Sequence, residues 1–161
     1  MVNLDRFKRA QDRSFEGFDT ALDEMQAGRK RSHWIWYIFP QLAGLGSSSM
    51  SARFALEGPD EAAAYLHDPV LRERLLAVTS AVAAHLEHRP PAALNDLMGS
   101  ETDVLKLVSS MTLFREVARR AHRDEALADA ADLAAKADAI LRVAAEQGHP
   151  ECASTLRQLA A

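Results

Sequence analysis

The sequence predicts an all-α protein, folded as a single compact domain (residues 1–161) of about six to eight helices, several of them short. Alanine, the strongest helix former, occurs 30 times in 161 residues. Valine, isoleucine and threonine, which favour strands, together occur only 16 times. Seven glycines and six prolines are too few for the many turns of an all-β fold.

The first predicted helix covers residues 4–27. Asn3 can cap its start, and Gly28 can end it in a left-handed conformation. Along it, residues that are all apolar except Gln11 recur every three or four positions, which is typical of the buried face of a helix. They are Leu4, Phe7, Gln11, Phe15, Phe18, Leu22 and Met25. Residues 28–49 show neither helical nor strand period because a proline and glycines interrupt them, and helix resumes near 48–56.

Two proline-based signals mark the next helix starts. Pro59 is predicted to begin one helix, which has acidic residues in its first turn. Asp68 can cap the next helix, which has Pro69 at its first position. Arg89-Pro90-Pro91 ends this helix. Its predicted buried face consists of Leu71, Leu75, Val78, Val82 and Leu86.

Four further helices complete the expected fold. A short helix covers about 92–98, and Ser100 with Asp103 resembles a capping box ahead of a long helix. An alanine-rich helix covers 124–147, where small residues permit close packing, and a last short helix covers 151–159. The buried face of the long helix is predicted to contain Val104, Leu107, Val108, Met111, Phe114 and Ala118.

Charge and cysteine content narrow the class of protein. The net charge of −4, with both signs interspersed, gives no general attraction to nucleic acid. One cysteine excludes an internal disulfide, and neither a signal peptide nor a membrane-spanning run is recognisable. We therefore expect a cytoplasmic protein with no nucleic-acid or membrane partner, no metal and no cofactor. Its oligomeric state is left open. Residues 1–53 carry a net +2, so an anion site should lie there.

Residues 28–49 combine three features of an anion-binding site. They contain the basic run Arg29–Arg31, four of the ten aromatic residues within 34–39, and a glycine- and serine-rich start of a helix. Glycines let the backbone approach a ligand, and helix N-termini favour negative charge. On the long helix, two serines follow Lys106 by one turn. The predicted binding residues are Arg29, Lys30, His33, Trp34, Trp36, Gln41, Gly44, Gly46, Ser47, Ser48, Lys106, Ser109 and Ser110.

Each feature also has a simpler explanation. Serines before a helix are ordinary caps, basic triplets are usually solvated, and the aromatic run can be a core segment whose indole N–H groups are satisfied locally. His85 and His88 have metal-ligand spacing but lack a third ligand in sequence. Cys152 could act as a nucleophile only with a low pKa, for which its one sequence neighbour of suitable chemistry is His149.

Three stretches resemble a bacterial family catalogued as domain of unknown function 1810. They are SHWIWYIFPQLAGLGSSSM (32–50), YLHDPVL (65–71) and DVLKLVSSMTLF (103–114). The resemblance covers most of the chain and implies a mainly helical domain without an established activity. Some members carry the label calpastatin, which denotes a disordered inhibitor and does not fit packed helices. The family's signature lies in polar and aromatic segments, which suggests a shared site.

Together these features favour a pocket for a small anionic, nucleotide-like metabolite. Such a pocket requires four side chains to converge: His33, Gln41, Lys106 and Ser110. One alternative is an enzyme that hydrolyses a glycosidic or phosphate bond in such a ligand, with His33 or Asp103 as the base. Another is a protein–protein interaction module that exposes the Trp34–Phe39 segment.

Overall fold

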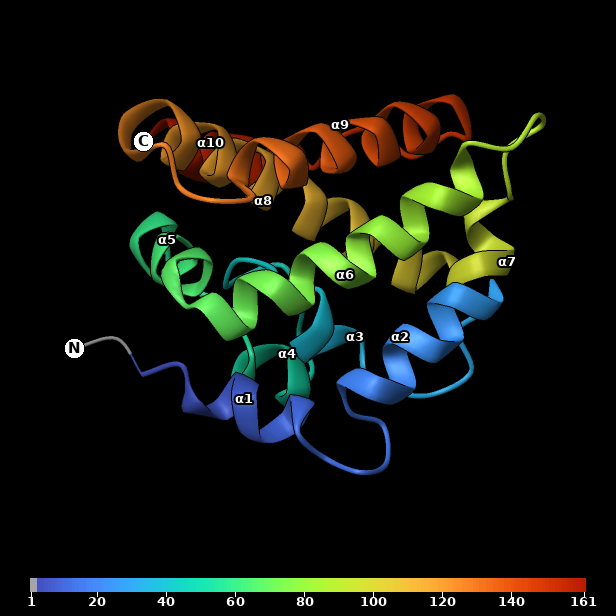
Figure 1. The fold of residues 1–161 in the computed structure, drawn as a ribbon, viewed down its shortest axis with the longest axis horizontal. Helices are drawn as coiled ribbons and strands as arrows, with labels where there is room; N and C mark the ends of the chain where they lie inside the picture. Colours follow the sequence, from blue (N-terminus) through green and yellow to red (C-terminus); the bar gives the residue numbers. More distant parts are fainter. Residues whose placement is uncertain (1–2) are drawn as a thin grey trace.

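Ten helices account for most of residues 3–161, the part of the chain described by this computed structural model (Figure 1). Within that part the chain forms no β-strand, and the pairing of Leu42 with Leu56 is an isolated bridge. None of the described helices is long and apolar enough to cross a membrane. The all-α class is confirmed, but six to eight helices were expected. The helices are α1 (Asp5–Gln11), α2 (Phe18–Ala27), α3 (Ile35–Ile38), α4 (Ser49–Arg53), α5 (Pro59–His67), α6 (Pro69–Leu86), α7 (Leu94–Met98), α8 (Glu101–Glu125), α9 (Ala130–Glu146) and α10 (Ala153–Ala160).

The main departure from the prediction lies in residues 4–27, where α1 and α2 replace one helix. Between them Glu16 adopts a left-handed φ of 58°. Gly17 packs so tightly that a Cβ there would lie 2.2 Å from a backbone carbonyl oxygen. Phe15, which its spacing places on the apolar stripe, is 72% exposed. The Tyr37 hydroxyl donates to the Glu16 carbonyl oxygen, so a distant residue holds the turn that breaks the helix.

Local capping signals place the starts of α6 and α8 correctly. The Asp68 carboxylate accepts two backbone N–H groups of the first turn of α6, where Pro69 occupies the start of the helix. The Ser100 hydroxyl accepts the backbone N–H of Asp103 at the start of α8. Gly28 ends α2 in the left-handed conformation, at a φ of 89°. These three boundaries need no information beyond a few neighbouring residues. The alanine-rich helix, expected from residue 124, begins instead at Ala130, because α8 continues to Glu125 and ends at Ala126 in a left-handed conformation.

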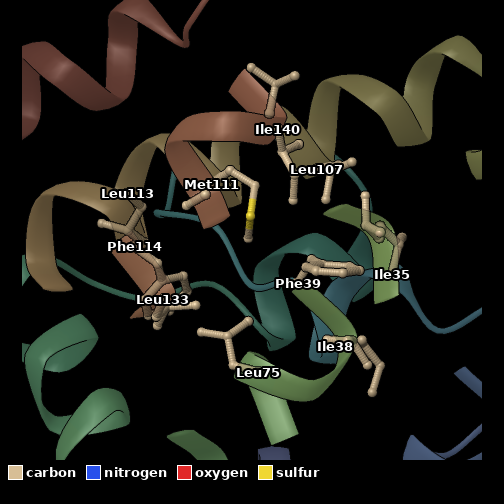
Figure 2. Close-up of a cluster of buried hydrophobic side chains, with 14 of the residues drawn as sticks. Ile35, Ile38, Phe39, Leu75, Leu107, Met111, Leu113, Phe114, Leu133 and Ile140 are labelled. Carbon is tan, nitrogen blue, oxygen red and sulfur yellow. The ribbon is translucent and has the colours of Figure 1, made fainter. Parts of the chain in front are cut away.

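Helix α8 is the central element of the core and packs against α3, α5, α7, α9 and α10. Alanines on the buried face of α9 allow it to pack closely on α8. Ile35 and Phe39 lie in the same buried cluster as Met111 of α8 (Figure 2). Of residues 34–39, only Trp36 is not fully buried. The exposed aromatic surface expected for an interaction module is therefore absent from this segment.

Residues near the C-terminus hold the segment that leads into α7. The side-chain amide of Gln147 accepts the backbone N–H of Leu94 at 2.8 Å and donates to the carbonyl oxygen of Ala92 at 2.9 Å. Because α7 is followed closely by α8, this contact ties the end of α9 to the approach to the central helix. Ile140 and Leu141 of α9 are buried in the same core.

A histidine–carboxylate contact joins α5 to the end of α8 and gives a pH-dependent prediction. His67 lies 2.5 Å from the Glu125 carboxylate and 2.7 Å from the Ala63 carbonyl oxygen. Both contacts favour the protonated ring, so they raise the pKa of His67 above 6.5. The stabilisation is complete below pH 6.5 and is lost as the pH rises through the raised pKa.

Urea unfolding on either side of that raised pKa measures this contribution. We expect His67→Gln to remove roughly 0.5 kcal/mol of stability on the acidic side and almost nothing on the alkaline side, because the pair is partly exposed. His88→Gln, at an exposed position just after α6, serves as the control. Equal losses for His67→Gln at both pH values would contradict the assignment.

Candidate functional site

Seven of the predicted binding residues line one groove, which we call the α8 groove. It lies between residues 41–51 and the first turns of α8, and its volume is about 500 Å³. The side chains of Leu45 and Leu105 add apolar surface, and that of Thr102 borders one end. The seven predicted residues are Gln41, Gly44, Gly46, Ser47, Ser48, Lys106 and Ser109.

The glycine- and serine-rich wall of the groove is largely explained by its own packing. Gly44 adopts a left-handed φ of 90°. At Gly46 a Cβ would lie 2.4 Å from the Ser51 hydroxyl, so only glycine fits beside that side chain. The Ser48 hydroxyl accepts the backbone N–H of Ser51 and donates to its hydroxyl, which caps the short helix α4. Ser48 is thus an ordinary cap, while Ser47 is exposed.

Lys106 is the one charged side chain that lines the α8 groove in the described part of the chain. Its side chain is 19% exposed. The ammonium lies 3.8 Å from a carboxylate oxygen of Asp103, too far for a hydrogen bond, and 5.9 Å from the centre of the Trp36 ring. Its N–H groups therefore make no hydrogen bond within residues 3–161 and can serve a ligand.

A second cavity, of about 380 Å³, adjoins the α8 groove at Thr102, which borders both. Three more of the predicted residues line it, namely Lys30, His33 and Trp36. Asp103 also lines it, so both candidate bases of the hydrolase hypothesis, His33 and Asp103, face the same cavity.

Two of the side chains that line the second cavity, Lys30 and His33, differ in how accessible they are to a ligand. Lys30 is buried, its ammonium pairs with Asp103 at 2.8 Å, and it donates to the Ser32 carbonyl oxygen at 2.6 Å. It also lies 5.0 Å from the centre of the Trp34 ring. These contacts fasten the 30–34 segment to α8, so Lys30 mainly serves the fold. The His33 side chain, by contrast, is 81% exposed.

Three predicted binding residues line neither cavity. Arg29 is exposed and Ser110 is fully buried. Trp34 is also fully buried, and its indole N–H donates to the Glu24 carboxylate at 2.9 Å, so no face of its ring is free to stack on a ligand. The pocket that the sequence predicts, with all four side chains converging, is therefore not formed, because Gln41 and Lys106 meet in the groove while the other two residues do not join them. Those two are His33 and Ser110.

Cys152, immediately before α10, has a lowered thiol pKa that arises from other groups than the predicted His149. Burial raises the pKa of the thiol, but the hydroxyls of Thr155 and Ser109 and the backbone N–H groups of α10 lower it below its ordinary value. His149 has no part in this shift. Ser109, one of the two residues whose hydroxyls lower this pKa, also lines the α8 groove.

Fold and site together define an all-helical domain with a polar groove beside its central helix. The family model described as "Protein of unknown function (DUF1810)" matches residues 1–138, and the chain belongs to that family, as its motifs indicate. The crystal structure of the conserved hypothetical protein Rv1873 from Mycobacterium tuberculosis is similar, with 35% sequence identity and a TM-score of 0.76. The match covers 98% of this chain and 96% of that one. None of the curated proteins matches significantly.

Proposed function

We propose that this chain binds a small anionic, nucleotide-like metabolite in the α8 groove, at a smaller site than the one expected from the sequence, since it includes Gln41 and Lys106 but neither His33 nor Ser110. The observation that carries the proposal is Lys106, whose ammonium makes no hydrogen bond within residues 3–161 and pairs with Asp103 only at 3.8 Å. It borders a groove lined by hydroxyl and amide groups and, in the same part of the chain, by no carboxylate. A volume of about 500 Å³ suits a metabolite of nucleotide size. Leu45 and Leu105 supply apolar surface against which a flat ring can lie.

The local charge balance also favours an anion, although the whole chain is acidic. Lys106 borders the α8 groove, and Lys30 and Arg31 border the adjoining cavity. Asp103 is the single carboxylate that lines either cavity within residues 3–161, so three cations face one anion when His33 is counted as neutral. A concave surface with an excess of one sign concentrates ligands of the other sign.

Thermal unfolding and tryptophan fluorescence in the presence of nucleotides, ADP-ribose and phosphosugars test this proposal. A ligand at a hundred times its Kd stabilises the folded state by about 2.7 kcal/mol, which raises the Tm of a chain of this size by roughly 5–10 °C. Trp36 borders the second cavity and lies near Lys106, so its fluorescence should change on binding.

Matched lysine variants locate the effect. Lys106→Met should weaken binding at least tenfold because it removes the one cation of the α8 groove. Lys136→Met changes the charge equally but lies on α9, where Lys136 pairs with exposed Asp132 and lines neither cavity. It should leave binding unchanged. No response to the whole ligand set, or an equal loss in both variants, would count against the proposal.

Hydrolysis of a glycosidic or phosphate bond in the bound ligand is the second candidate function. It draws support from one observation, namely that His33 and Asp103 line the same cavity next to the α8 groove. Product analysis with Asp103→Asn and His33→Ala decides between binding and turnover. If a product forms equally well with both variants, neither residue is the base.

A further inference from the structure

A small cavity lies beside the α8 groove, and we call it the indole pocket. It is lined by Trp36, Phe39, Gln41, Ser51, Phe54 and Lys106. Three of these residues, Gln41, Ser51 and Lys106, also line the groove, so the two spaces are neighbours. The volume of the pocket is about 10 Å³, which is roughly enough for one water molecule or one oxygen atom.

All four polar side chains around this pocket can donate a hydrogen bond. The indole N–H of Trp36 is buried and has no hydrogen-bond partner within residues 3–161. An indole nitrogen and an ammonium can only donate, whereas the amide of Gln41 and the hydroxyl of Ser51 can do so as well as accept. No carboxylate lines the pocket in the described part of the chain. Buried donors are almost always paired in folded proteins, so an indole N–H without a partner inside the fold calls for an acceptor oxygen, supplied by water or by a ligand.

The two tryptophans of the chain make the contrast clear. Trp34 is the more deeply buried of the pair, yet its indole N–H is satisfied by the Glu24 carboxylate within the fold. Trp36 is partly exposed, but its N–H is buried and lacks such an internal acceptor. The tryptophan that belongs to the core therefore has its acceptor inside the fold, whereas the indole N–H of the one beside the groove makes no hydrogen bond within residues 3–161.

We propose that the indole pocket receives one oxygen of an anionic group, phosphate or carboxylate, whose remaining atoms lie in the α8 groove. Trp36 donates its indole N–H to that oxygen, and Lys106 donates from the groove side and neutralises the charge. This inference rests on the proposed function and makes it more specific, because it states which end of the ligand is held and by which donors. A single position for that oxygen also orients the ligand.

Nuclear magnetic resonance of the 15N-labelled full chain tests the proposal, because two tryptophans give two indole N–H signals. Trp36→Phe assigns the signals by removing one of them. During titration with inorganic phosphate, and separately with acetate, the Trp36 signal should shift and saturate while the Trp34 signal stays fixed. Sodium chloride at equal ionic strength is the control. Phosphate and acetate arms distinguish the two kinds of anion, and a shift with either supports the pocket.

Variants extend the test beyond the one signal. Trp36→Phe keeps the ring but removes the donor, and it should weaken phosphate binding about tenfold, as should Lys106→Met. Lys136→Met should change nothing. If Trp36→Phe fails to fold, the wild-type titration and Lys106→Met remain decisive. A Trp36 signal that does not move, or that moves equally with chloride, overturns the inference.

The failures of the two proposals are distinguishable. If a metabolite binds and shifts the backbone signals of Gly44 and Gly46 while the Trp36 indole signal stays fixed, the groove binds ligands but the indole pocket does not hold their anionic group. If no metabolite, phosphate or acetate shifts either set of signals, the proposed function fails together with this inference.

Discussion

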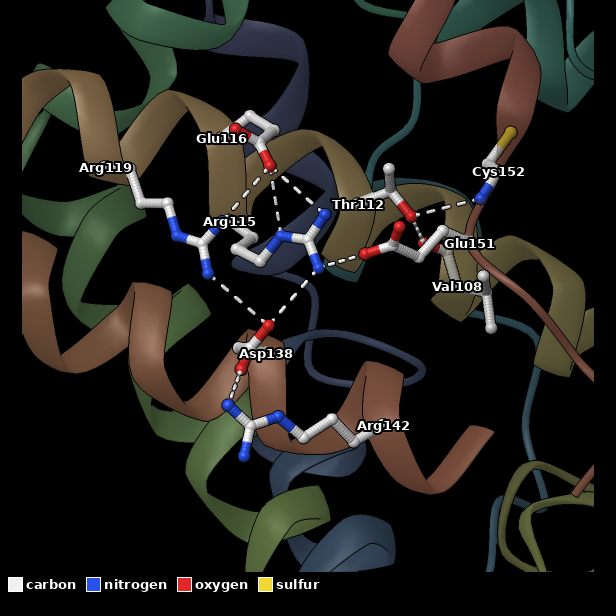
Figure 3. Close-up of polar contacts among 9 residues, drawn as sticks. All are labelled: Val108, Thr112, Arg115, Glu116, Arg119, Asp138, Arg142, Glu151 and Cys152. Atoms are coloured by element: carbon white, nitrogen blue, oxygen red, sulfur yellow. Dashed lines mark hydrogen bonds and ion pairs between the residues drawn. The ribbon is translucent and has the colours of Figure 1, made fainter. Parts of the chain in front are cut away.

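Replacing Arg115 with Met is expected to lower the free energy of unfolding by roughly 3 kcal/mol or more. The Arg115 side chain is only 8% exposed and joins three structural elements (Figure 3). Its guanidinium pairs with Glu116 at 3.1 Å, with Asp138 of α9 at 3.3 Å, and with Glu151 just before α10. Burial by itself lowers the pKa of Arg115, but Glu151 and Glu116 raise it by more. The net pKa is therefore raised, and the guanidinium stays charged.

The loss has a specific physical cause. Without Arg115, the three carboxylates remain close together and partly buried, and only part of their charge is compensated. Asp138 retains Arg119 at 3.4 Å and Arg142 at 2.7 Å, whereas Glu151 has no other ion pair within residues 3–161. The segment before α10 should therefore loosen first, and amide hydrogen exchange in α10 should rise more than in α6.

Arg119→Met is the matched control for this experiment. Arg119 pairs with two of the three acids that contact Arg115, namely Glu116 and Asp138, but its side chain is 51% exposed. Its removal should cost less than about 1 kcal/mol. Urea unfolding followed by circular dichroism measures both variants. Equal losses would show that burial of the Arg115 guanidinium is not what makes its contacts strong.

Replacing Glu24 with Ala is expected to cost about 3 kcal/mol and to release the 31–34 segment from α2. Glu24 accepts four hydrogen bonds, which come from the backbone N–H groups of Arg31 and Ser32, the Ser32 hydroxyl and the Trp34 indole N–H. The donor–acceptor distances run from 2.6 to 3.0 Å. Alanine would leave the buried indole N–H without a partner. Asp23→Ala, at the exposed position beside it, should change stability by less than about 0.5 kcal/mol.

Glu24 also predicts how stability falls in acid. Burial raises its pKa, but the bonds from Ser32, Arg31 and Trp34 outweigh burial and lower the pKa below 4.5. The stabilisation is therefore present above pH 4.5 and is lost as the pH falls through the lowered pKa. Glu24→Gln keeps an acceptor oxygen but has no charge. Its free energy of unfolding should therefore lie between those of the wild-type protein and Glu24→Ala, and it should lack this acid dependence. An unchanged acid profile in Glu24→Gln would contradict the assignment.

Local signals were enough for most of the fold. Asp68, Ser100 and Gly28 each mark a helix end through interactions with residues a few positions away, so their patterns are visible in the sequence. The break between α1 and α2 was not predictable in this way. Phe15 continues the helical spacing, but the contact of Tyr37 with Glu16 holds the turn instead. That contact depends on tertiary structure.

In the candidate site too, groupings of nearby residues could be predicted, whereas contacts between distant residues could not. The grouping of glycine, serine and glutamine in residues 41–48, together with Lys106, predicts a shared groove, and these residues do line one. The assignments of Lys30 and Trp34 to a ligand failed to anticipate Asp103 and Glu24, the partners that occupy them inside the fold. Residue type indicates what a side chain can bind but not whether a distant residue already binds it.

The side-chain bridge of Gln147 has a consequence for how this family is delimited. The family model matches this chain as far as residue 138, yet Gln147 holds the backbone on both sides of Ala93, and Ile140 and Leu141 are buried in the core. The sequence signature is therefore shorter than the set of residues that pack together. A comparison of relatives that stops at residue 138 would omit side chains that support α7. Helix α7 leads directly into the start of α8, which lines the groove.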